Sequence, residues 1–360
     1  MRALPKLPGR PAFCLAALLL ASCGGGGGGA AMSGFVATSL VSNNGSAGNP
    51  YSGAHVDARL VNAWGIAFNP QGFVWVANNG TSTSTLYDGT GAPQSLVVTV
   101  PSGPTGIVFN GSTSFNVVQG GVSGASAFIF AGESGTVSGW SPAVNMNNAI
   151  VAVDGAAQGK VYKGLALATQ GGAPRLYAAD FHNGTVDVFD ANFAPVVSVG
   201  AFRDPNLPAG YAPFGIQAIG SQIFVSFAKQ DAAAHDEVDG AGLGAIDIFD
   251  TAGNLTARLI PPGGALNAPW GMALAPANFG PLSNALLVGN FGDGKINAYN
   301  PMTGASLGTL ARSDGSAIVI DGLWGIAFGN GMNAQPTNTL FFAAGPAGES
   351  NGVYGRIDFH

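Results

Sequence analysis

Asn62-Ala63-Trp64-Gly65-Ile66-Ala67-Phe68 is the stretch that decides the fold, because its pattern returns five more times. Each copy has a bulky or polar residue, then a glycine, then an apolar run with the character of a buried strand. The repeat glycines are Gly65, Gly106, Gly164, Gly215, Gly271 and Gly325, spaced 41 to 58 residues apart. This period is that of a propeller blade with four strands, so the sequence predicts a propeller of six blades.

The composition of the chain supports an all-β protein. It has 360 residues, with 57 glycines, 22 prolines and 47% hydrophobic residues, but only 9% are charged. So few charges cannot solvate the outer faces of long amphipathic helices, and the high hydrophobic content excludes a disordered chain. The net charge of −6 argues against binding to a nucleic acid backbone.

The two ends of the repeat array predict how the ring closes. The sixth unit reaches His360 after three strands, and an unassigned strand, Phe35 to Val41, precedes the first unit. Pairing this strand with Val353 to Phe359 would complete the sixth blade and remove two open sheet edges. We therefore expect residues 35–360 to form one six-bladed β-propeller, with the fourth strand of the third blade over Pro195 to Gly200.

The N-terminus has the features of a targeting segment. Three basic residues within the first ten precede a short apolar run, Phe13 to Leu20, which is too short to span a membrane. Leu20-Ala21-Ser22-Cys23 resembles the lipobox of bacterial lipoproteins, in which the cysteine is lipidated. This predicts a signal peptide over 1–22, a lipidated Cys23 followed by a glycine-rich tether to residue 34, and an address at the outer membrane. The alternative is an ordinary secreted protein with a chance cysteine. With Cys23 lipidated, the folded domain has no cysteine, which excludes a disulfide or a thiolate metal site.

Several motifs resemble a family of uncharacterised bacterial proteins linked to exosortase (PEP-CTERM) sorting. The motifs are Leu60 to Gly65, Trp75-Val76-Ala77-Asn78-Asn79-Gly80, Ala268 to Gly271, Leu287 to Gly294 and Asp321 to Gly325. The resemblance implies a propeller-like fold and no established activity. The blades are also similar, more loosely, to NHL repeats and to metal-dependent lactonase propellers.

The residue before each repeat glycine is expected to lie at the mouth of the central channel. These residues are Trp64, Thr105, Lys163, Phe214, Trp270 and Trp324. In lactonase propellers the matching positions hold ligands of a divalent metal, but four aromatic rings and a lysine cannot form an oxygen cage for such an ion. The aromatic residues either plug the channel or form a platform for a sugar, a ring or an apolar chain, with Trp64, Lys163, Phe214, Trp270 and Trp324 as the candidate binding residues.

The loops after the second strand of each blade are expected on this same face. They carry most of the reactive polar groups, including Glu133, Asp180, His182, Asp293 and Glu349, although several of their sequences are also common turn signals. Asp180, His182 and Asp293 are the catalytic candidates, because histidine titrates nearest neutral pH.

An insertion in the fourth blade, Lys229 to Leu243, concentrates further acidic residues. Its candidate metal ligands are Asp231, His235, Asp236, Glu237 and Asp239. The alternative to a metal site is an acidic loop exposed to solvent. We expect no cofactor other than a divalent cation such as Ca²⁺.

These features favour a binding or scaffold module of the cell envelope. Its partner would be an envelope protein, a glycan or a small aromatic or apolar ligand. We expect a monomer that contacts the membrane through its lipid anchor only. The alternative is a hydrolase or lyase with an Asp/His site and a metal; the sequence leaves open whether the protein is an enzyme.

Overall fold

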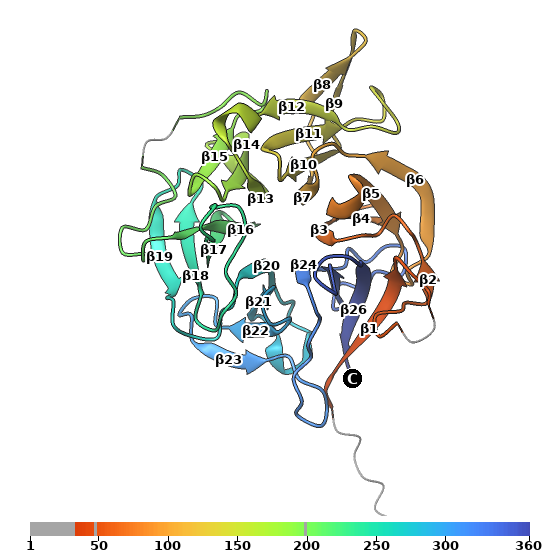
Figure 1. Cartoon of the computed structure of the whole chain (residues 1–360), viewed down its shortest axis with the longest axis vertical. Helices are drawn as coiled ribbons and strands as arrows, with labels where there is room; N and C mark the ends of the chain where they lie inside the picture. The colour runs from red at the N-terminus through yellow and green to blue at the C-terminus, as the bar shows by residue number, and fades with distance from the viewer. Residues whose placement is uncertain (1–32, 47–48, 198–199) are drawn as a thin grey trace, which may run out of the picture. The chain divides into compact units, whose positions relative to one another are not determined.

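Six sheets of three to five strands surround a central axis in this computed structural model (Figure 1). It describes residues 33–46, 49–197 and 200–360. The predicted signal peptide, Cys23 and nearly all of the tether lie outside the described residues. No helix in the described part of the chain is long and apolar enough to cross a membrane.

The strands follow each other from the axis outward in blades one to five. Blade one contains β3 (Ala63–Phe68), β4 (Val74–Asn78), β5 (Thr83–Tyr87) and β6 (Pro93–Thr99). Blade two contains β7 (Pro104–Phe109), β10 (Phe128–Gly132), β11 (Thr136–Trp140) and β12 (Ile150–Asp154). Blade three contains β13 (Tyr162–Gln170), β14 (Ala173–Asp180) and β15 (Thr185–Phe189). Blades four and five contain β16 (Tyr211–Ile219), β17 (Gln222–Lys229), β18 (Gly244–Asp250) and β19 (Leu255–Ile260), and then β20 (Pro269–Leu274), β21 (Leu286–Asn290), β22 (Ile296–Tyr299) and β23 (Ser306–Thr309).

The sixth blade confirms the predicted ring closure. It has the order β2–β1–β26–β25–β24, in which β1 (Phe35–Ser42) and β2 (His55–Val56) come from the N-terminal part of the chain and β24 (Leu323–Phe328), β25 (Leu340–Ala344) and β26 (Val353–Phe359) from its end. Phe35 pairs with Phe359 and Ser42 with Val353. In addition, the Gly34 amide donates to the His360 carbonyl at 2.9 Å. The orange-red β1 accordingly lies beside the dark blue β26 (Figure 1).

Close approach of neighbouring blades explains the repeat glycines. The innermost strands contact one another in the order β3, β7, β13, β16, β20 and β24, and β24 contacts β3. A Cβ atom on Gly65 would lie 2.5 Å from the carbonyl oxygen of Thr105 in the next blade, and one on Gly215 would lie 2.1 Å from that of Trp270. Such distances exclude any side chain, so only glycine fits.

A break in strand register accompanies each repeat glycine. In blade one, for example, the pairing of β3 with β4 shifts between Ala63 and Ile66, and the innermost pair of every other blade shifts at the matching place. Such bulges re-aim a side chain. They explain how the residue before the glycine turns toward the axis while the strand after it packs between blades.

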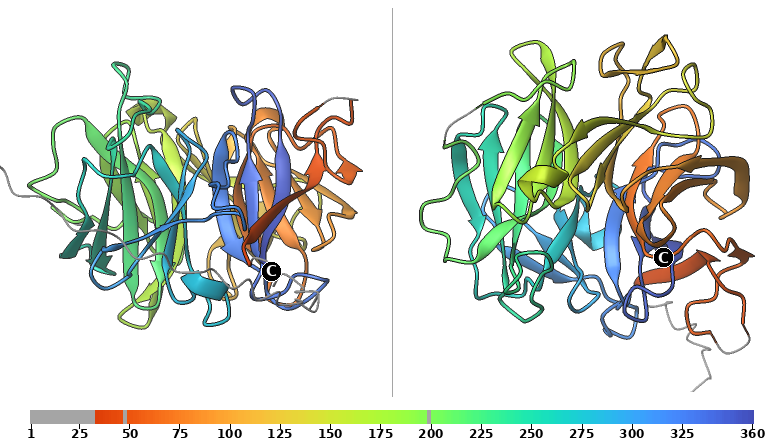
Figure 2. Two further views of the ribbon diagram at one scale, coloured as in Figure 1. Left: turned by 90° about the horizontal axis from the view of Figure 1, so that it is seen from below. Right: turned by 45° about the horizontal axis from the view of Figure 1, so that its top comes forward.

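Two local features differ from the sequence prediction. The fourth strand expected over 195–200 is absent from the described part of blade three, where only a Phe189–Pro195 bridge and a bond from the Val196 amide to Val188 continue the sheet. Pro195 has no N–H to donate to a ladder, which disfavours a regular strand; residues 198–199 are outside the described chain. An unpredicted hairpin, β8 (Asn116–Gln119) and β9 (Val122–Ala125), projects from blade two (Figures 1 and 2).

Blade four encloses an ionisable group between its strands and the preceding loop. Asp247 of β18 is completely buried, opposite Arg258 of β19, and Arg258 Nε donates to Asp204 Oδ2 at 2.6 Å. Neither carboxyl oxygen of Asp247 has a hydrogen-bond partner among the described residues. Burial, together with the nearby Asp204 carboxylate, raises the pKa of Asp247 to about 7.

Candidate functional site at the loop face

An aromatic cluster fills the axis just below the loop face. The Trp64 and Trp324 rings are stacked with centroids 3.6 Å apart, and Trp270 meets each of them edge-on at 6.0 and 5.8 Å. Phe214 contacts Trp324 from blade four, and Phe291 stacks on Trp324 at 4.0 Å. Trp64 and Trp324 are each only 1% exposed. Buried rings cannot stack on a ligand that approaches from this face, so the geometry corresponds to a plug and not to a platform.

Lys163 is the charged member of the same ring of positions. Its side chain is 1% exposed, and its ammonium group lies 5.1 Å from the centroid of the Trp64 ring, a cation–π distance. Nζ donates to Glu133 Oε1 and, at 3.1 Å, to Asp236 Oδ1. Burial alone lowers the pKa of Lys163, but the surrounding carboxylates outweigh it, so the pKa is raised and the side chain remains an ammonium ion.

Glu133 belongs to a hydrogen-bonded chain that crosses three blades. It projects from the β10–β11 turn, and its Oε2 accepts a 2.7 Å bond from Asn79 Nδ2, in the loop of blade one. Asn79 Oδ1 accepts in turn from Asn62, whose own Oδ1 accepts from the Trp324 indole. The polar loop groups and the aromatic plug therefore form one connected structure.

The blade-four insertion brings a second set of acidic side chains to the mouth. Gln230 Nε2 bonds the Phe181 carbonyl in the blade-three loop, and the Gly240 amide bonds Asn267 near blade five, so the insertion is tied down on both sides. Within it, Asp231 Oδ1 accepts from the His235 amide. Asp231 thus shapes the loop, whereas His235 and Asp236 extend toward Glu133.

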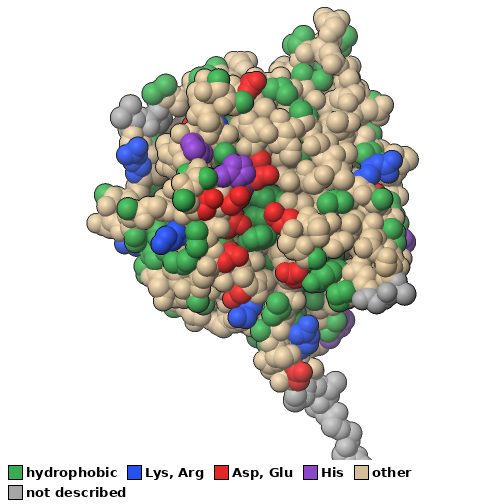
Figure 3. Space-filling model, in the orientation of Figure 1, with side chains coloured by type: hydrophobic (Ala, Val, Ile, Leu, Met, Phe, Trp, Pro, Cys, Tyr) green, Lys and Arg blue, Asp and Glu red, His purple; other side chains and the backbone are tan. Residues whose placement is uncertain are grey.

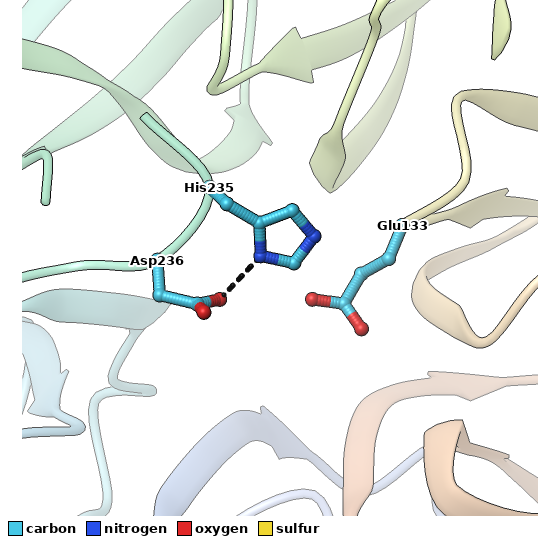
Figure 4. Close-up of side chains that lie close together, drawn as sticks. All are labelled: Glu133, His235 and Asp236. Carbon is cyan, nitrogen blue, oxygen red and sulfur yellow. Dashed lines mark hydrogen bonds and ion pairs between the residues drawn. The ribbon is translucent and has the colours of Figure 1, made fainter. Parts of the chain in front are cut away.

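Glu133, His235 and Asp236 are close enough to bind one ion. A ligand atom from each lies within 4.8 Å of the others. His235 Nδ1 and Asp236 Oδ1 are 2.9 Å apart, and Glu133 faces them from the opposite loop (Figure 4). Two carboxylates and an imidazole are suitable donors for a divalent metal. However, Lys163 already contacts both carboxylates, and its positive charge competes with a metal ion for them.

The wider rim of the mouth has more acidic groups than cations. Burial raises the pKa of Glu237 to about 7, despite the opposing effect of Lys163. Burial and the Glu133 carboxylate raise the pKa of Glu349, and burial and Asp293 raise that of Asp239. Acidic side chains and histidines accordingly gather around the centre of this face (Figure 3). The mouth is a region of mutually repelling carboxylates, to which a positive ligand would be attracted.

The predicted Asp180–His182 pair does not form. Asp180 is completely buried, and its oxygens accept bonds from Lys160, the Val161 amide and Asn183. His182 is exposed, and its Nδ1 lies 3.2 Å from the Ala234 carbonyl instead. Asp293 accepts from Asn290 and Lys295 within its own turn. Asp180 and Asp293 therefore have positions that stabilise turns.

Glu133 and Glu349 are the mouth residues that sequence reasoning noted but did not select. Both follow the second strand of their blades, at turns that resemble ordinary hairpin connections. The available signal was positional, because equivalent loops of all blades meet at one end of a propeller.

The fold and the mouth define a six-bladed β-propeller with a plugged axis and an acidic loop face. An uncharacterised protein of Acanthamoeba polyphaga mimivirus, R648, is 34% identical to the chain in an alignment of 318 residues that covers 84% of this chain and 76% of that protein. Another uncharacterised mimivirus protein, L690, is 34% identical over 318 residues, 84% of this chain and 82% of its own length. The chain belongs to the family of these proteins. No family model matches it.

Solved structures show the same fold at low sequence identity. A protein of unknown function from Bacteroides thetaiotaomicron VPI-5482 has a TM-score of 0.55 and 10% identity, covering 91% of this chain and 76% of that chain. A streptogramin B lyase has a TM-score of 0.50 and 14% identity (91% and 99% covered), and a glucose dehydrogenase 0.51 and 13% (83% and 96% covered). At such identities the likeness concerns the fold alone.

The expected membership of a bacterial exosortase-linked family is wrong. The matching relatives are mimivirus proteins, and they match across most of the chain. The motifs behind that expectation include the repeat glycines and turns that this fold requires of any member, so they indicate the architecture more strongly than the lineage.

Proposed function

We propose that the protein is a binding module that takes a positively charged ligand at its acidic loop face. The observation that carries this proposal is the meeting of Glu133, Asp236, Glu237 and Glu349, from three blades, around a single buried ammonium group. Glu133 and Asp236 already share the charge of this one lysine, so any charge on Glu237 or Glu349 stays uncompensated. A ligand that supplies one or two positive charges would relieve their repulsion and is favoured over a neutral or anionic one.

Isothermal titration calorimetry with two probes tests this proposal. The probes are calcium chloride, which supplies Ca²⁺, and 1,5-diaminopentane, which is a diammonium ion at neutral pH. The two cations carry the same charge, but only Ca²⁺ can be coordinated and only the diammonium ion donates N–H hydrogen bonds. We expect saturable binding of at least one probe, weakened about tenfold by Glu133→Gln, which corresponds to ~1.4 kcal/mol. Asp314→Asn removes an equal charge from an exposed turn after β23 and should leave the affinity unchanged. Absence of binding by both probes would contradict the proposal.

A metal-dependent hydrolase or lyase is the second candidate, favoured by the Glu133–His235–Asp236 geometry. Solved propellers of similar fold include a streptogramin B lyase, so the scaffold is compatible with a lyase activity. In this case Mn²⁺ should bind, and His235→Ala should weaken Mn²⁺ binding while leaving diaminopentane binding intact. Equal weakening of both probes would favour the binding module.

The cellular address is a separate proposal that rests on the sequence of residues 1–23. Lipidation of Cys23 would place the domain outside the cytoplasm on the outer membrane, where an envelope component bearing amines could be its partner. Cys23→Ser should then shift the protein from the membrane fraction to the soluble extracytoplasmic fraction. Unchanged membrane retention would argue against a lipid anchor.

A further inference from the structure

The channel is open at the face opposite the acidic mouth. There the ends of the six innermost strands surround a cavity of about 550 Å³. Strand pairing fixes the two ends, because Ala63 pairs with Asn78 near the loop face whereas Phe68 pairs with Val74 at the other end. The cavity is lined by the three residues that follow the repeat glycine in five blades, such as Ile66 to Phe68 in blade one, and by residues 217–220 of blade four.

The side chains that line this cavity carry no charge, in contrast to those of the acidic mouth. None of its lining residues is titratable, and Gln217 alone among them has a polar side chain. The six innermost strands are also terminal strands of their sheets, so one backbone edge of each lacks a strand partner among the described residues. These edges and Gln217 can satisfy a neutral polar group, but nothing lining the cavity can compensate a buried charge.

The inner end of the cavity is closed. A much smaller space, about 40 Å³, continues inward past the repeat glycines and ends against Trp270. Trp270 packs edge-on against Trp64 and Trp324, so the aromatic plug separates the cavity from the acidic face. A molecule that enters from the far face therefore reaches a blind end, whose walls combine apolar side chains with backbone polar groups.

We propose that this cavity binds a neutral small molecule that combines apolar surface with hydrogen-bonding groups. Its volume lies within the range of about 300–1,000 Å³ found for small-molecule sites. Exposed backbone edges beside apolar side chains suit a ligand of one to three rings that also carries polar groups. The uncharged lining selects against ions. This site is independent of the proposed cation site and does not rest on it.

Binding of the neutral fluorophore N-phenyl-1-naphthylamine tests the proposal. We expect saturable binding with one site per chain. Ala327→Trp places an indole in the cavity and should reduce affinity at least tenfold. Leu307→Trp adds the same group on exposed β23 and should have no effect. Each variant is first compared with the wild type by thermal unfolding. If Ala327→Trp does not fold, Gln217→Leu removes the one polar side chain of the lining and is expected to reduce affinity about threefold.

The outcomes separate this site from other surfaces. Weaker binding by Ala327→Trp or Gln217→Leu, with retention in Leu307→Trp and Glu133→Gln, would support the cavity. No saturable binding, equal binding by the wild type and the cavity variants, or loss on Glu133→Gln would overturn it. Failure of the cation titrations would leave this result unaffected, because Glu133 lies beyond the aromatic plug.

Discussion

Replacing Asp247 with asparagine should abolish a large part of the protein's pH-dependent stability. The carboxyl group of Asp247 is buried beside Asp204 and Arg258, and its pKa is raised from 3.8 to about 7. Between these two values the folded state holds a proton that the unfolded state has released. The contribution of Asp247 to the free energy of unfolding is therefore fully present below pH 3.8 and is lost as pH rises through 7. Above pH 3.8 the folded protein must either keep a proton that the unfolded chain releases or bury a charge.

The size of this effect follows from the gap between the two pKa values. Each pKa unit corresponds to ~1.4 kcal/mol, so the wild type should lose about 4 kcal/mol from this group between pH 3.5 and pH 7.5. Asparagine resembles the neutral carboxyl group in shape but does not titrate. The difference in unfolding free energy between variant and wild type should thus change by about 4 kcal/mol, in favour of the variant, over that range.

Urea unfolding followed by tryptophan fluorescence at several pH values measures this difference. Asp250→Asn is a control in the same strand: hydrogen bonds from the following turn outweigh burial and lower the Asp250 pKa, so its contribution is lost as pH falls. Parallel pH profiles for wild type and Asp247→Asn would refute the reasoning, since they would mean that Asp247 titrates alike in both states.

Three further outcomes are expected. Trp64→Ala and Trp324→Ala should each cost ~3–5 kcal/mol in urea unfolding, as large core truncations do; costs below 1 kcal/mol would argue against a plug. Deleting residues 1–42 removes β1 with its buried Phe35 and Val41 and should cost about 3–6 kcal/mol relative to deleting residues 1–32; equal stability of the two truncations would contradict the closure. Lys163→Met should cost ~3–5 kcal/mol, because two carboxylates lose their buried partner, yet should tighten Ca²⁺ binding in calorimetry; unchanged or weaker binding would mean that Lys163 does not compete for the site.

The architecture could be predicted from sequence because its determinants are local and repeated. A glycine is required wherever an innermost strand approaches the backbone of the next blade this closely, and that requirement recurs once per blade. The β8–β9 hairpin had a local signal as well, in the Gly120-Gly121 turn between its strands, but it lies outside the repeat and was not recognised.

The site could be predicted only in part, because it depends on loops that are distant in sequence. Lys163 was placed at the channel mouth from its repeat position, and the insertion was recognised as acidic. That Glu133 and Asp236 share this one ammonium group required the angular positions of blades two, three and four. Conversely, Asp180 and His182 are two residues apart in sequence, but strand and turn geometry direct them to different partners.

The pairing of β1 with β26 also sets the order of events during synthesis. β1 is the first strand of the propeller to leave the ribosome, whereas its antiparallel partner β26 is the last. Until β26 is made, the edge of β1 that pairs with it has unpaired backbone groups. Five blades form during this interval, and each one brings the two ends of the incomplete ring closer together. Closing the ring is therefore a step of very high contact order that comes after translation of the propeller. The nascent chain needs protection against strand exchange with its neighbours over that interval.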